Sequence, residues 1–338
     1  MNEEVLPEDR LQRLEELLPY LRGLQIGLPK AVVRSSEMLS IAPEVPKAEL
    51  RAEIDALPPK QCLMAYKNFL VYYGDVTQLP RTLDQIARLR ELTFRAHQEG
   101  SGLSEDRDRF DETYFHLFAW DVHAQAIVGA YRLGKTDLLR AELGNAAVYL
   151  AQMFDFAEEF YTGPPLLEIG RSFVAPDYQR NTYSLFLLWC GISRYLLHNP
   201  QYRRLYGVVS MSRLYDARAM AVIRDVLLEP RSDVRAEDPY EPDLGGEWQT
   251  FLAETRPMTM KDLSRIVKAL DDEARDIPVL IRHYHKLGAR FHAAAVDRNF
   301  NNTPGLLLRL NVPAMPRKYL KMYFGEGELL ERYLAYDD

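Results

Sequence analysis

The strongest constraint on the fold is a run of strand-forming residues that leads through a short polar loop into an apolar helix. Residues 166–174 read LLEIGRSFV, residues 175–182 are polar or contain proline, and residues 183–197 are largely apolar. A strand that feeds a helix through a short connection is the unit from which α/β sheets are built. The sequence therefore predicts that Glu168 and Arg171 lie on a strand that ends beside a helix N-terminus.

The rest of the chain alternates between helical and strand patterns. The predicted helices cover residues 8–24, 48–57, 83–95, 183–197, 215–228 and 263–287, the last interrupted by Pro278. The predicted strands cover residues 69–73, 116–121, 126–133, 166–174 and 205–211, with a closing hairpin at residues 291–296 and 305–312. We therefore predict an α/β fold with a mixed central sheet flanked by helices.

The same pattern divides the chain into segments. Residues 1–60 contain two short helices and a proline-containing linker, and are predicted to form a helical N-terminal extension. Residues 61–325 form the main domain, which ends in a helix and hairpin. Within it, residues 229–258 are predicted to be a surface excursion because residues 229–248 are rich in Asp, Glu, Pro and Gly. Residues 326–338 are predicted to be a C-terminal tail.

Composition excludes several classes of protein. The 338 residues are 47% hydrophobic and 27% charged, as in globular proteins, and the net charge of −7 disfavours non-specific nucleic-acid binding. Cys62 and Cys190 lack the spacing of a disulfide framework or a zinc site, so we expect no metal. We also expect no permanently bound cofactor. The acidic N-terminus does not resemble a signal peptide, and residues 183–192 are too short to span a bilayer. We expect a cytoplasmic protein, with peripheral contact to the inner face of the membrane as an open alternative.

Several sequence blocks in a fixed order resemble one enzyme family. They are Arg88–Arg95, Asp108–Asp111, Ile127–Gly134, Glu168–Phe173, Val208–Tyr215 and the segment 278–310. Together they are similar to the GNAT-superfamily N-acyltransferases that use acyl carrier protein. This group includes ornithine-lipid, glycine-lipid and N-acyl amino acid synthases and the hemolysin-like proteins. The acyl-homoserine-lactone synthases are more distantly similar.

The resemblance implies a reaction and a set of site residues. The reaction moves a long-chain fatty acyl group, with or without a 3-hydroxyl, from acyl carrier protein to the α-amine of an amino acid, giving an N-acyl amino acid or lyso-aminolipid. The implied catalytic residues are Glu168, Arg171 and Tyr215. The implied substrate-binding residues are Arg90, Phe94, Asp108, Asp111, Arg132 and Ser210.

Each role has a chemical reason. A partly buried Glu168 suits a general base, because desolvation raises the pKa of a carboxyl. Arg132 or Arg171 could bind an acceptor carboxylate bidentately, and Tyr215 could protonate the leaving thiolate. The alternative is that Glu168 pairs with Arg171 in a polar core, although on a regular strand these side chains point to opposite faces unless a bulge intervenes.

The aspartates also have two interpretations. The spacing of Asp108 and Asp111 suits a loop that binds an amine or orders Arg90, which shares a helical face with Phe94. The alternative is that both aspartates only cap that loop.

The loop before the apolar helix bears on the acyl donor. Acetyl-CoA enzymes of this superfamily cradle the pyrophosphate with glycine-containing loops, whereas Thr182 and Ser184 stand at those places here. A pantetheine arm on a carrier protein therefore fits better, with acyl-CoA as an alternative donor. The residues predicted to contact the pantetheine are Val174, Gln179, Arg180, Asn181, Thr182 and Tyr183.

An acidic carrier protein requires a basic patch despite the net charge of −7. Arginines near the carrier-facing helix could supply one, or they could belong to an ordinary mixed surface: Arg180, Arg194, Arg203, Arg204 and Arg213. Two rival functions stay open. One is an acyl-homoserine-lactone-type synthase that uses S-adenosylmethionine, and the other is a non-catalytic protein that binds the carrier or a membrane.

Overall fold

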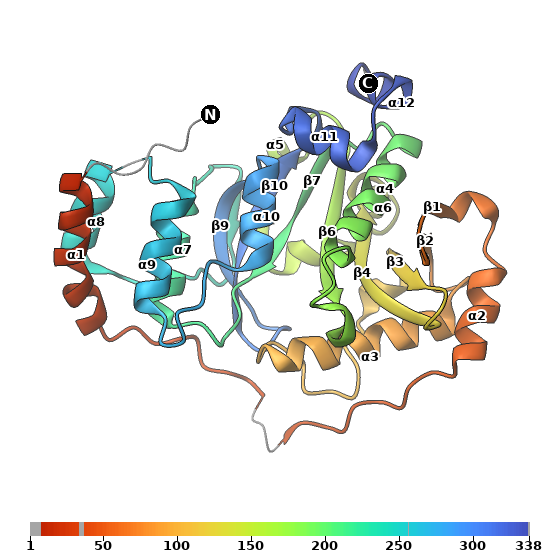
Figure 1. Ribbon diagram of the computed structural model, residues 1–338, viewed down its shortest axis with the longest axis horizontal. Coiled ribbons are helices and arrows are strands. Elements are labelled where there is room, and N and C mark those ends of the chain that lie inside the picture. Colours follow the sequence, from red (N-terminus) through yellow and green to blue (C-terminus); the bar gives the residue numbers. More distant parts are fainter. Residues whose placement is uncertain (1–7, 34–36, 256, 337–338) are drawn as a thin grey trace.

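The computed structural model describes residues 8–33, 37–255 and 257–336, and a mixed sheet runs through the molecule with helices on both faces (Figure 1). The strands are β1 (Cys62–Tyr66), β2 (Phe69–Gly74), β3 (Phe115–Asp121), β4 (Ala126–Lys135), β5 (Phe154–Phe156), β6 (Leu166–Val174), β7 (Arg204–Ser210), β8 (Val234–Ala236), β9 (Arg290–Asp297) and β10 (Thr303–Asn311). The main sheet has the order β1-β2-β3-β4-β6-β7-β10-β9, and β5 pairs with β8. The predicted α/β class is confirmed.

The helices cover both faces of the sheet and one of its ends. They are α1 (Glu8–Gly23), α2 (Lys47–Asp55), α3 (Pro80–Ala96), α4 (Thr136–Leu143), α5 (Glu158–Tyr161), α6 (Ser184–His198), α7 (Ala217–Leu227), α8 (Gly245–Thr255), α9 (Met260–Leu270), α10 (Val279–Leu287), α11 (Arg317–Phe324) and α12 (Glu328–Leu334). Helix α6 packs on β1 to β4 and contacts α11 and α12, which explains why it is apolar on most sides. Helix α1 packs against α8 and α9 at the far end of the molecule.

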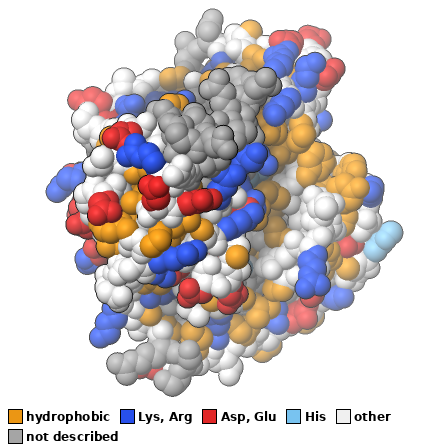
Figure 2. Space-filling view, turned by 60° about the vertical axis from the view of Figure 1, so that its left-hand side comes forward, with side chains coloured by type: hydrophobic (Ala, Val, Ile, Leu, Met, Phe, Trp, Pro, Cys, Tyr) orange, Lys and Arg blue, Asp and Glu red, His pale blue; other side chains and the backbone are white. Residues whose placement is uncertain are grey.

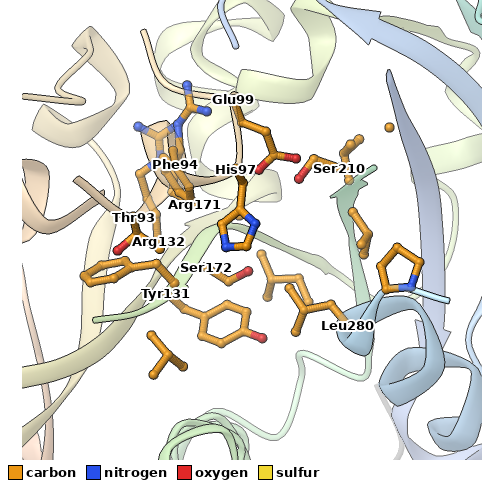
Figure 3. A pocket seen from close by; sticks show the side chains of 18 of the residues that line it. Thr93, Phe94, His97, Glu99, Tyr131, Arg132, Arg171, Ser172, Ser210 and Leu280 are labelled. Carbon is orange, nitrogen blue, oxygen red and sulfur yellow. The ribbon is translucent and has the colours of Figure 1, made fainter. Parts of the chain in front are cut away.

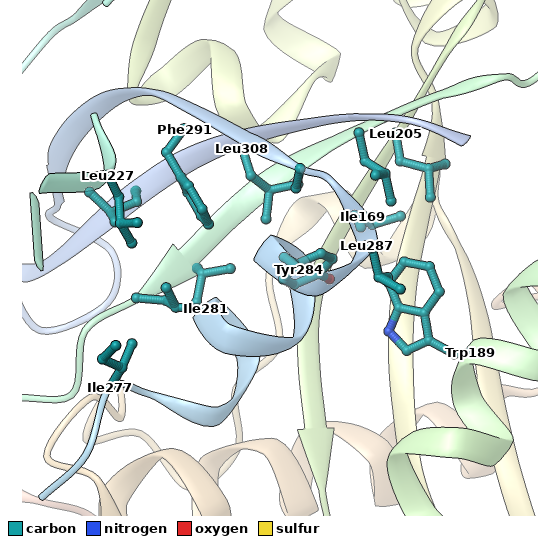
Figure 4. Close-up of a cluster of buried hydrophobic side chains, with 14 of the residues drawn as sticks. Ile169, Trp189, Leu205, Leu227, Ile277, Ile281, Tyr284, Leu287, Phe291 and Leu308 are labelled. Carbon is teal, nitrogen blue, oxygen red and sulfur yellow. The ribbon is translucent and has the colours of Figure 1, made fainter. Parts of the chain in front are cut away.

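The core on the α10 side of the sheet is built from alternate strand residues. Ile169 of β6, Leu205 of β7 and Leu308 of β10 meet Ile281 and Leu287 of α10 in one buried cluster (Figure 4). On the opposite face, a second cluster contains several aromatic side chains, including Tyr114, Tyr149, Phe160 and Tyr206. Leu166 of β6 and Tyr206 of β7 belong to this second cluster, and Tyr206 pairs with Glu168 in the sheet.

Strands β6 and β7 form a parallel pair that opens into a fork. Their pairing runs from Leu166 and Arg204 to Glu168 and Tyr206 and then stops, although β6 continues to Val174 and β7 to Ser210. Each strand keeps its outer neighbour, β4 or β10, beyond that point. Gly207 sits at the fork, where a β carbon would lie 2.3 Å from the carbonyl oxygen of Ile169. A larger residue there would push the strands apart next to the Glu168–Tyr206 pair.

The structure corrects parts of the predicted organisation. Residues 69–73 were predicted as the first strand, but β1 precedes them and forms a hairpin with β2, with Lys67 at a φ of 54° in the turn. The predicted excursion at 229–258 contains β8 and α8, and several of its side chains are buried, including Tyr240, Leu244 and Trp248. The predicted C-terminal tail contains helix α12, which packs on α6. These segments escaped prediction because each is short and becomes stable only through tertiary packing.

Within the described residues, none of the helices combines the length and the hydropathy that a bilayer span requires.

The buried position of Trp248 generates a test. Its indole Nε1 donates a hydrogen bond to Oδ2 of Asp225 at 2.9 Å, and the side chain is fully buried. Trp248→Ala should lower the free energy of unfolding by about 3–5 kcal/mol in urea titrations. The control is Leu143→Ala, because Leu143 is exposed, and its change should stay below about 0.5 kcal/mol. Equal small effects of both variants would mean that residues 229–258 do not belong to the core.

Candidate active site

The fork opens into a cavity of about 700 Å³. One wall is polar and comes from the end of α3, the loop after it and the facing residues of β4, β6 and β7. The other wall is apolar and includes Leu185 and Leu188 of α6 and Val279 and Leu280 of α10. Figure 3 shows this division, with Arg132, Arg171 and Phe94 on one side and Leu280 on the other. A cavity of this size and character is typical of a binding site for a small molecule or an acyl chain.

Glu168 lies at the fork, at the inner end of the cavity. It is buried and stands between Gly134 of β4 and Tyr206 of β7 in the sheet. The hydroxyl of Tyr114 donates a hydrogen bond to Oε2 of Glu168 at 2.8 Å, and that of Tyr206 donates to the same atom at 3.4 Å. Tyr114 reaches it by crossing over Gly134, where a β carbon would lie 2.4 Å from the tyrosine ring. The missing side chain at Gly134 therefore lets a tyrosine contact the carboxylate.

The surroundings of Glu168 tune its protonation. Burial raises the pKa of Glu168 to about 7, against the opposing effects of the hydrogen bond from Tyr114 and the charge of Arg132. Burial and the neighbouring carboxylate hold the pKa of Tyr114 far above its usual range, so Tyr114 stays protonated and donates. A carboxyl whose pKa lies near neutral pH can both accept and return a proton, as a general base requires.

Three arginines and three aspartates form a buried cluster behind this wall. Arg90 Nη2 donates to both oxygens of Asp111, at 2.9 and 3.0 Å, and Arg132 Nη1 donates to Oδ1 of Asp108 at 2.6 Å. Arg171 lies 3.4 Å from Asp106 and 3.5 Å from Asp108. Although burial alone would raise the pKa of Asp111, the charges of Arg90 and Arg132 hold it well below its usual range. The six formal charges balance, so the cluster fixes the wall without a large net field.

A bulge brings Arg171 to the same side as Glu168. The register between β4 and β6 shifts between Ala130 and Arg132, and Arg171 has a φ of 46°, in the left-handed region that few residues other than glycine adopt. The guanidinium of Arg171 lies 4.9 Å from the ring centroids of Tyr149 and of Phe300. No ion pair joins Glu168 and Arg171 among the described residues. The bulge that strand alternation required is therefore present, and the two side chains have separate partners.

The structure places the predicted acceptor residues in two groups. The cavity is lined by Glu168, Arg171, Phe94, Arg132 and Ser210. Arg90, Asp108 and Asp111 are not part of the lining and lie in the charge cluster behind it. Asp108 and Asp111 form a capping box at the short 3₁₀ helix Arg109–Glu112. The pair thus caps the loop and Asp111 also orders Arg90, whereas amine binding by these aspartates stays a prediction.

The predicted pantetheine-binding residues and the predicted proton donor, Tyr215, also fall into two groups, inside and outside the cavity lining. The lining includes Val174, Gln179, Asn181, Thr182 and Tyr215, whereas Arg180 and Tyr183 lie outside it. The hydroxyl of Tyr215 donates to the carbonyl oxygen of Asp276 at 2.6 Å. A proton transfer from Tyr215 to a thiolate therefore requires this hydrogen bond to break, and that role stays a prediction.

Several residues of the site were missed from the sequence. Tyr114 and Tyr206 hydrogen-bond to Glu168, Asp106 joins the charge cluster, and Glu99 lines the cavity. The polar character of residues 97–107 was the signal that could have indicated Glu99 and Asp106. The sequence held no signal for Tyr114 and Tyr206, because their contacts with Glu168 depend on sheet register. Among the described residues, no group of three His, Cys, Asp or Glu side chains is arranged to hold a metal ion.

Comparison with known proteins places this site in a family. A model described as "Acetyltransferase (GNAT) domain" matches residues 89–189. A glycine N(alpha)-acyltransferase from Bacteroides thetaiotaomicron is 30% identical over 298 residues, covering 81% of this chain and 87% of that protein. An L-ornithine N(alpha)-acyltransferase from Agrobacterium fabrum is 29% identical over 253 residues, covering 71% and 78% respectively.

Among solved structures, FeeM, an N-acyl amino acid synthase from uncultured soil microbes, aligns with a TM-score of 0.40 and 11% identity. The alignment covers 74% of this chain and 95% of that one. The identity and coverage of the bacterial relatives confirm the resemblance seen in the sequence blocks. The chain belongs to the family of GNAT-type N(alpha)-acyltransferases and is an acyltransferase.

Proposed function

We propose that this enzyme transfers a long-chain fatty acyl group from the thioester of acyl carrier protein to the α-amine of an amino acid. The product is an N-acyl amino acid or lyso-aminolipid. The observation that carries the proposal is the position of Glu168, a buried carboxyl with a pKa near 7 at the fork of β6 and β7. A base at this point can deprotonate an amine that attacks a thioester held between the strands.

The chemistry needs no covalent intermediate on the enzyme. The amine nitrogen forms a bond to the thioester carbon, the C–S bond breaks, and Glu168 accepts the proton that the nitrogen loses. The thiolate takes up a proton as it leaves. Tyr215 is our candidate donor because it lines the cavity, although its hydrogen bond to Asp276 must first open.

Arg171 is the proposed ligand of the acceptor carboxylate. It lines the cavity on the same side as Glu168, and its Nε faces Oδ2 of Asp106 at 3.4 Å without forming a hydrogen bond. A planar guanidinium can bind a carboxylate bidentately, which suits Arg171 to this role. Holding the α-carboxylate there would present the neighbouring α-amine to Glu168.

The loop before α6 supports a carrier-bound pantetheine over CoA. The backbone N–H groups of Asn181, Tyr183 and Ser184 donate to oxygens of the chain itself, at 3.0, 2.9 and 3.3 Å. Tyr183 donates to the side chain of Asn181, and Ser184 to its carbonyl. A pyrophosphate cradle needs such amides free. The facing edges of β6 and β7 beyond the fork have no strand partner there, which leaves backbone groups for the amides of a pantetheine arm.

The outer surface gives weaker support for a carrier. Arg203, Arg204 and Arg213 donate to backbone carbonyls and hold local structure. Of the five arginines in the predicted basic patch, Arg180 and Arg194 are the two that could still contact a carrier protein. Figure 2 shows basic, acidic and apolar side chains mixed on one face rather than a uniformly basic surface.

The direct test is mass spectrometry of lipid extracts from cells that express the wild type or Glu168→Gln. A new N-acyl amino acid only with the wild type is the expected result, and it identifies acceptor and chain together. A homoserine lactone, or no new lipid from a folded protein, would contradict the proposal.

The role of Glu168 predicts a pH dependence. The base must be ionised, and its ionised fraction grows as pH rises through about 7, so kcat/KM of the wild type should rise between about pH 6 and 8. Glu168→Gln should lower kcat/KM by about 10²- to 10⁴-fold and remove this limb of the profile. Glu142→Gln, at an exposed position on α4, is the matched control. A variant that kept both the rate and the limb would remove Glu168 as the base.

The role of Arg171 predicts a selective binding defect. Arg171→Lys should raise KM for an amino acid by about tenfold or more, because lysine cannot bind a carboxylate bidentately. The KM for the corresponding amino acid amide, which lacks the carboxylate, should change little. Steady-state kinetics with both acceptors measures this, and equal changes would point to a structural role for Arg171.

The loop before α6 predicts that the nucleotide part of CoA has little effect on the rate of transfer. Because three amides before α6 already donate within the chain, acyl-pantetheine and acyl-CoA should have kcat/KM values within about threefold of each other, and acylated carrier protein should exceed both. The three donors are compared with one chain length and one acceptor. A large advantage of acyl-CoA over acyl-pantetheine would instead indicate a pyrophosphate site.

A further inference from the structure

Glu99 is a buried acid that the proposed reaction does not use. It lines the cavity, is 5% exposed, and follows α3 in a loop that is held firmly. Its N–H donates to the carbonyl of Phe94 at 2.9 Å, and the carbonyl of His97 accepts a hydrogen bond from Ser212 at 3.0 Å. Other buried acids of this region have cationic partners, as Glu91 has Arg95. Among the described residues no lysine, arginine or histidine forms an ion pair with Glu99.

The neighbours of Glu99 are hydroxyl groups. Ser210 stands beside its carboxyl group and, against the larger effect of burial, lowers its pKa, and Figure 3 shows the two side chains next to each other, with His97 below them. Thr303 also lines the cavity, and its buried Oγ1 has no hydrogen-bond partner. Thr303 is two residues from Gly305, which stands opposite Ser210 in the sheet, so Thr303 and Ser210 belong to adjacent parts of one wall.

This arrangement lacks a positive charge. A buried carboxylate is costly unless a cation and hydrogen-bond donors accompany it. Burial raises the pKa of Glu99 to about 8, and burial also lowers the pKa of His97, so the histidine does not supply the charge at neutral pH. A ligand with an ammonium group would meet a carboxylate and at least one hydroxyl acceptor at this place.

We propose that Glu99, Ser210 and Thr303 form a second subsite, which binds a cationic group on the side chain of the acceptor amino acid. The proposal rests on the function proposed above and assigns its acceptor class, a dibasic amino acid. The enzyme then selects against glycine, which has no side-chain amine.

The position of the subsite fits such an acceptor. Tyr206, which contacts Glu168, and Ser210 are four residues apart on β7 and share one face, so their backbones are separated by about 13 Å. Glu168 and Glu99 therefore lie towards opposite ends of this stretch of β7, with Glu168 beside Tyr206 and Glu99 beside Ser210. An acceptor with two amines joined through an aliphatic side chain could place its α-amine at Glu168 and its other amine at Glu99.

The test uses three acceptors with one fixed acyl donor. Ornithine has the second amine, norvaline has the same side-chain length without it, and glycine has no side chain. The wild type should prefer ornithine over norvaline by about 10- to 100-fold in kcat/KM, the range expected for a hydrogen-bonded charge pair. Glu99→Gln should remove most of this preference while the norvaline value changes by less than about threefold.

Controls keep the proposal falsifiable. Glu142→Gln should retain the wild-type preference, since Glu142 is exposed on α4. Thr303→Val preserves shape and should lower the ornithine value selectively. If Glu99→Gln does not fold, Thr303→Val replaces it in the comparison. Calorimetric titration of the wild type with ornithine and norvaline then measures binding without turnover.

The outcomes separate the two proposals. Transfer to all three acceptors with no preference for ornithine, or an unchanged preference in Glu99→Gln, would overturn the subsite and leave the proposed function standing. Transfer to none of these or any other amino acid would overturn the proposed function itself.

Discussion

The separation of β6 and β7 beyond Glu168 and Tyr206 determines where every part of the site lies. A sheet normally cannot open in its middle without leaving backbone groups unpaired. Here each strand keeps its outer neighbour, so the cost falls only on the facing edges inside the cavity. In the proposed function, the amides of a pantetheine arm pair with those edges. Gly207 keeps the strands close up to the point of separation.

The buried charges act by cancelling one another. The charge of Arg132 lowers the pKa of Glu168, but burial has the larger effect and the pKa rises. Each arginine of the cluster faces at least one aspartate. In the proposed reaction the cluster acts indirectly. It holds Arg171 and the cavity wall in place, while Glu168 keeps a pKa near neutral pH.

The sequence predicted the elements of this site better than their mutual contacts. Residues 166–174 and 205–211 were recognisable because their β patterns are long, and both contribute to the cavity. The contact between Tyr206 and Glu168 could not be predicted, because it depends on the register of a parallel pair separated by a helix. The bulge at Arg171 was equally hidden, since its positive φ falls on an arginine rather than a glycine. Glu99 lies where no periodicity guides an interpretation.

The acids of the site affect stability with opposite signs. The pKa values of Glu168 and Glu99 in the folded state, about 7 and about 8, lie above the ordinary value of 4.5, so the native state retains protons that the unfolded chain loses. Their contribution to stability is present below about pH 4.5 and is lost as pH rises to about 7 or 8. Asp108 and Asp111 have lowered pKa values and contribute stability above their ordinary range, which is lost in acid.

At neutral pH the aspartates therefore hold the wall together while the two glutamates weaken it. A bound acceptor would change this balance, because an ammonium group near either glutamate stabilises its ionised form and removes part of the desolvation cost. Acceptor binding should consequently be linked to proton release from the protein at neutral pH. The same burial that makes Glu168 a usable base and leaves Glu99 without a cation thus makes the empty site less stable than the occupied one.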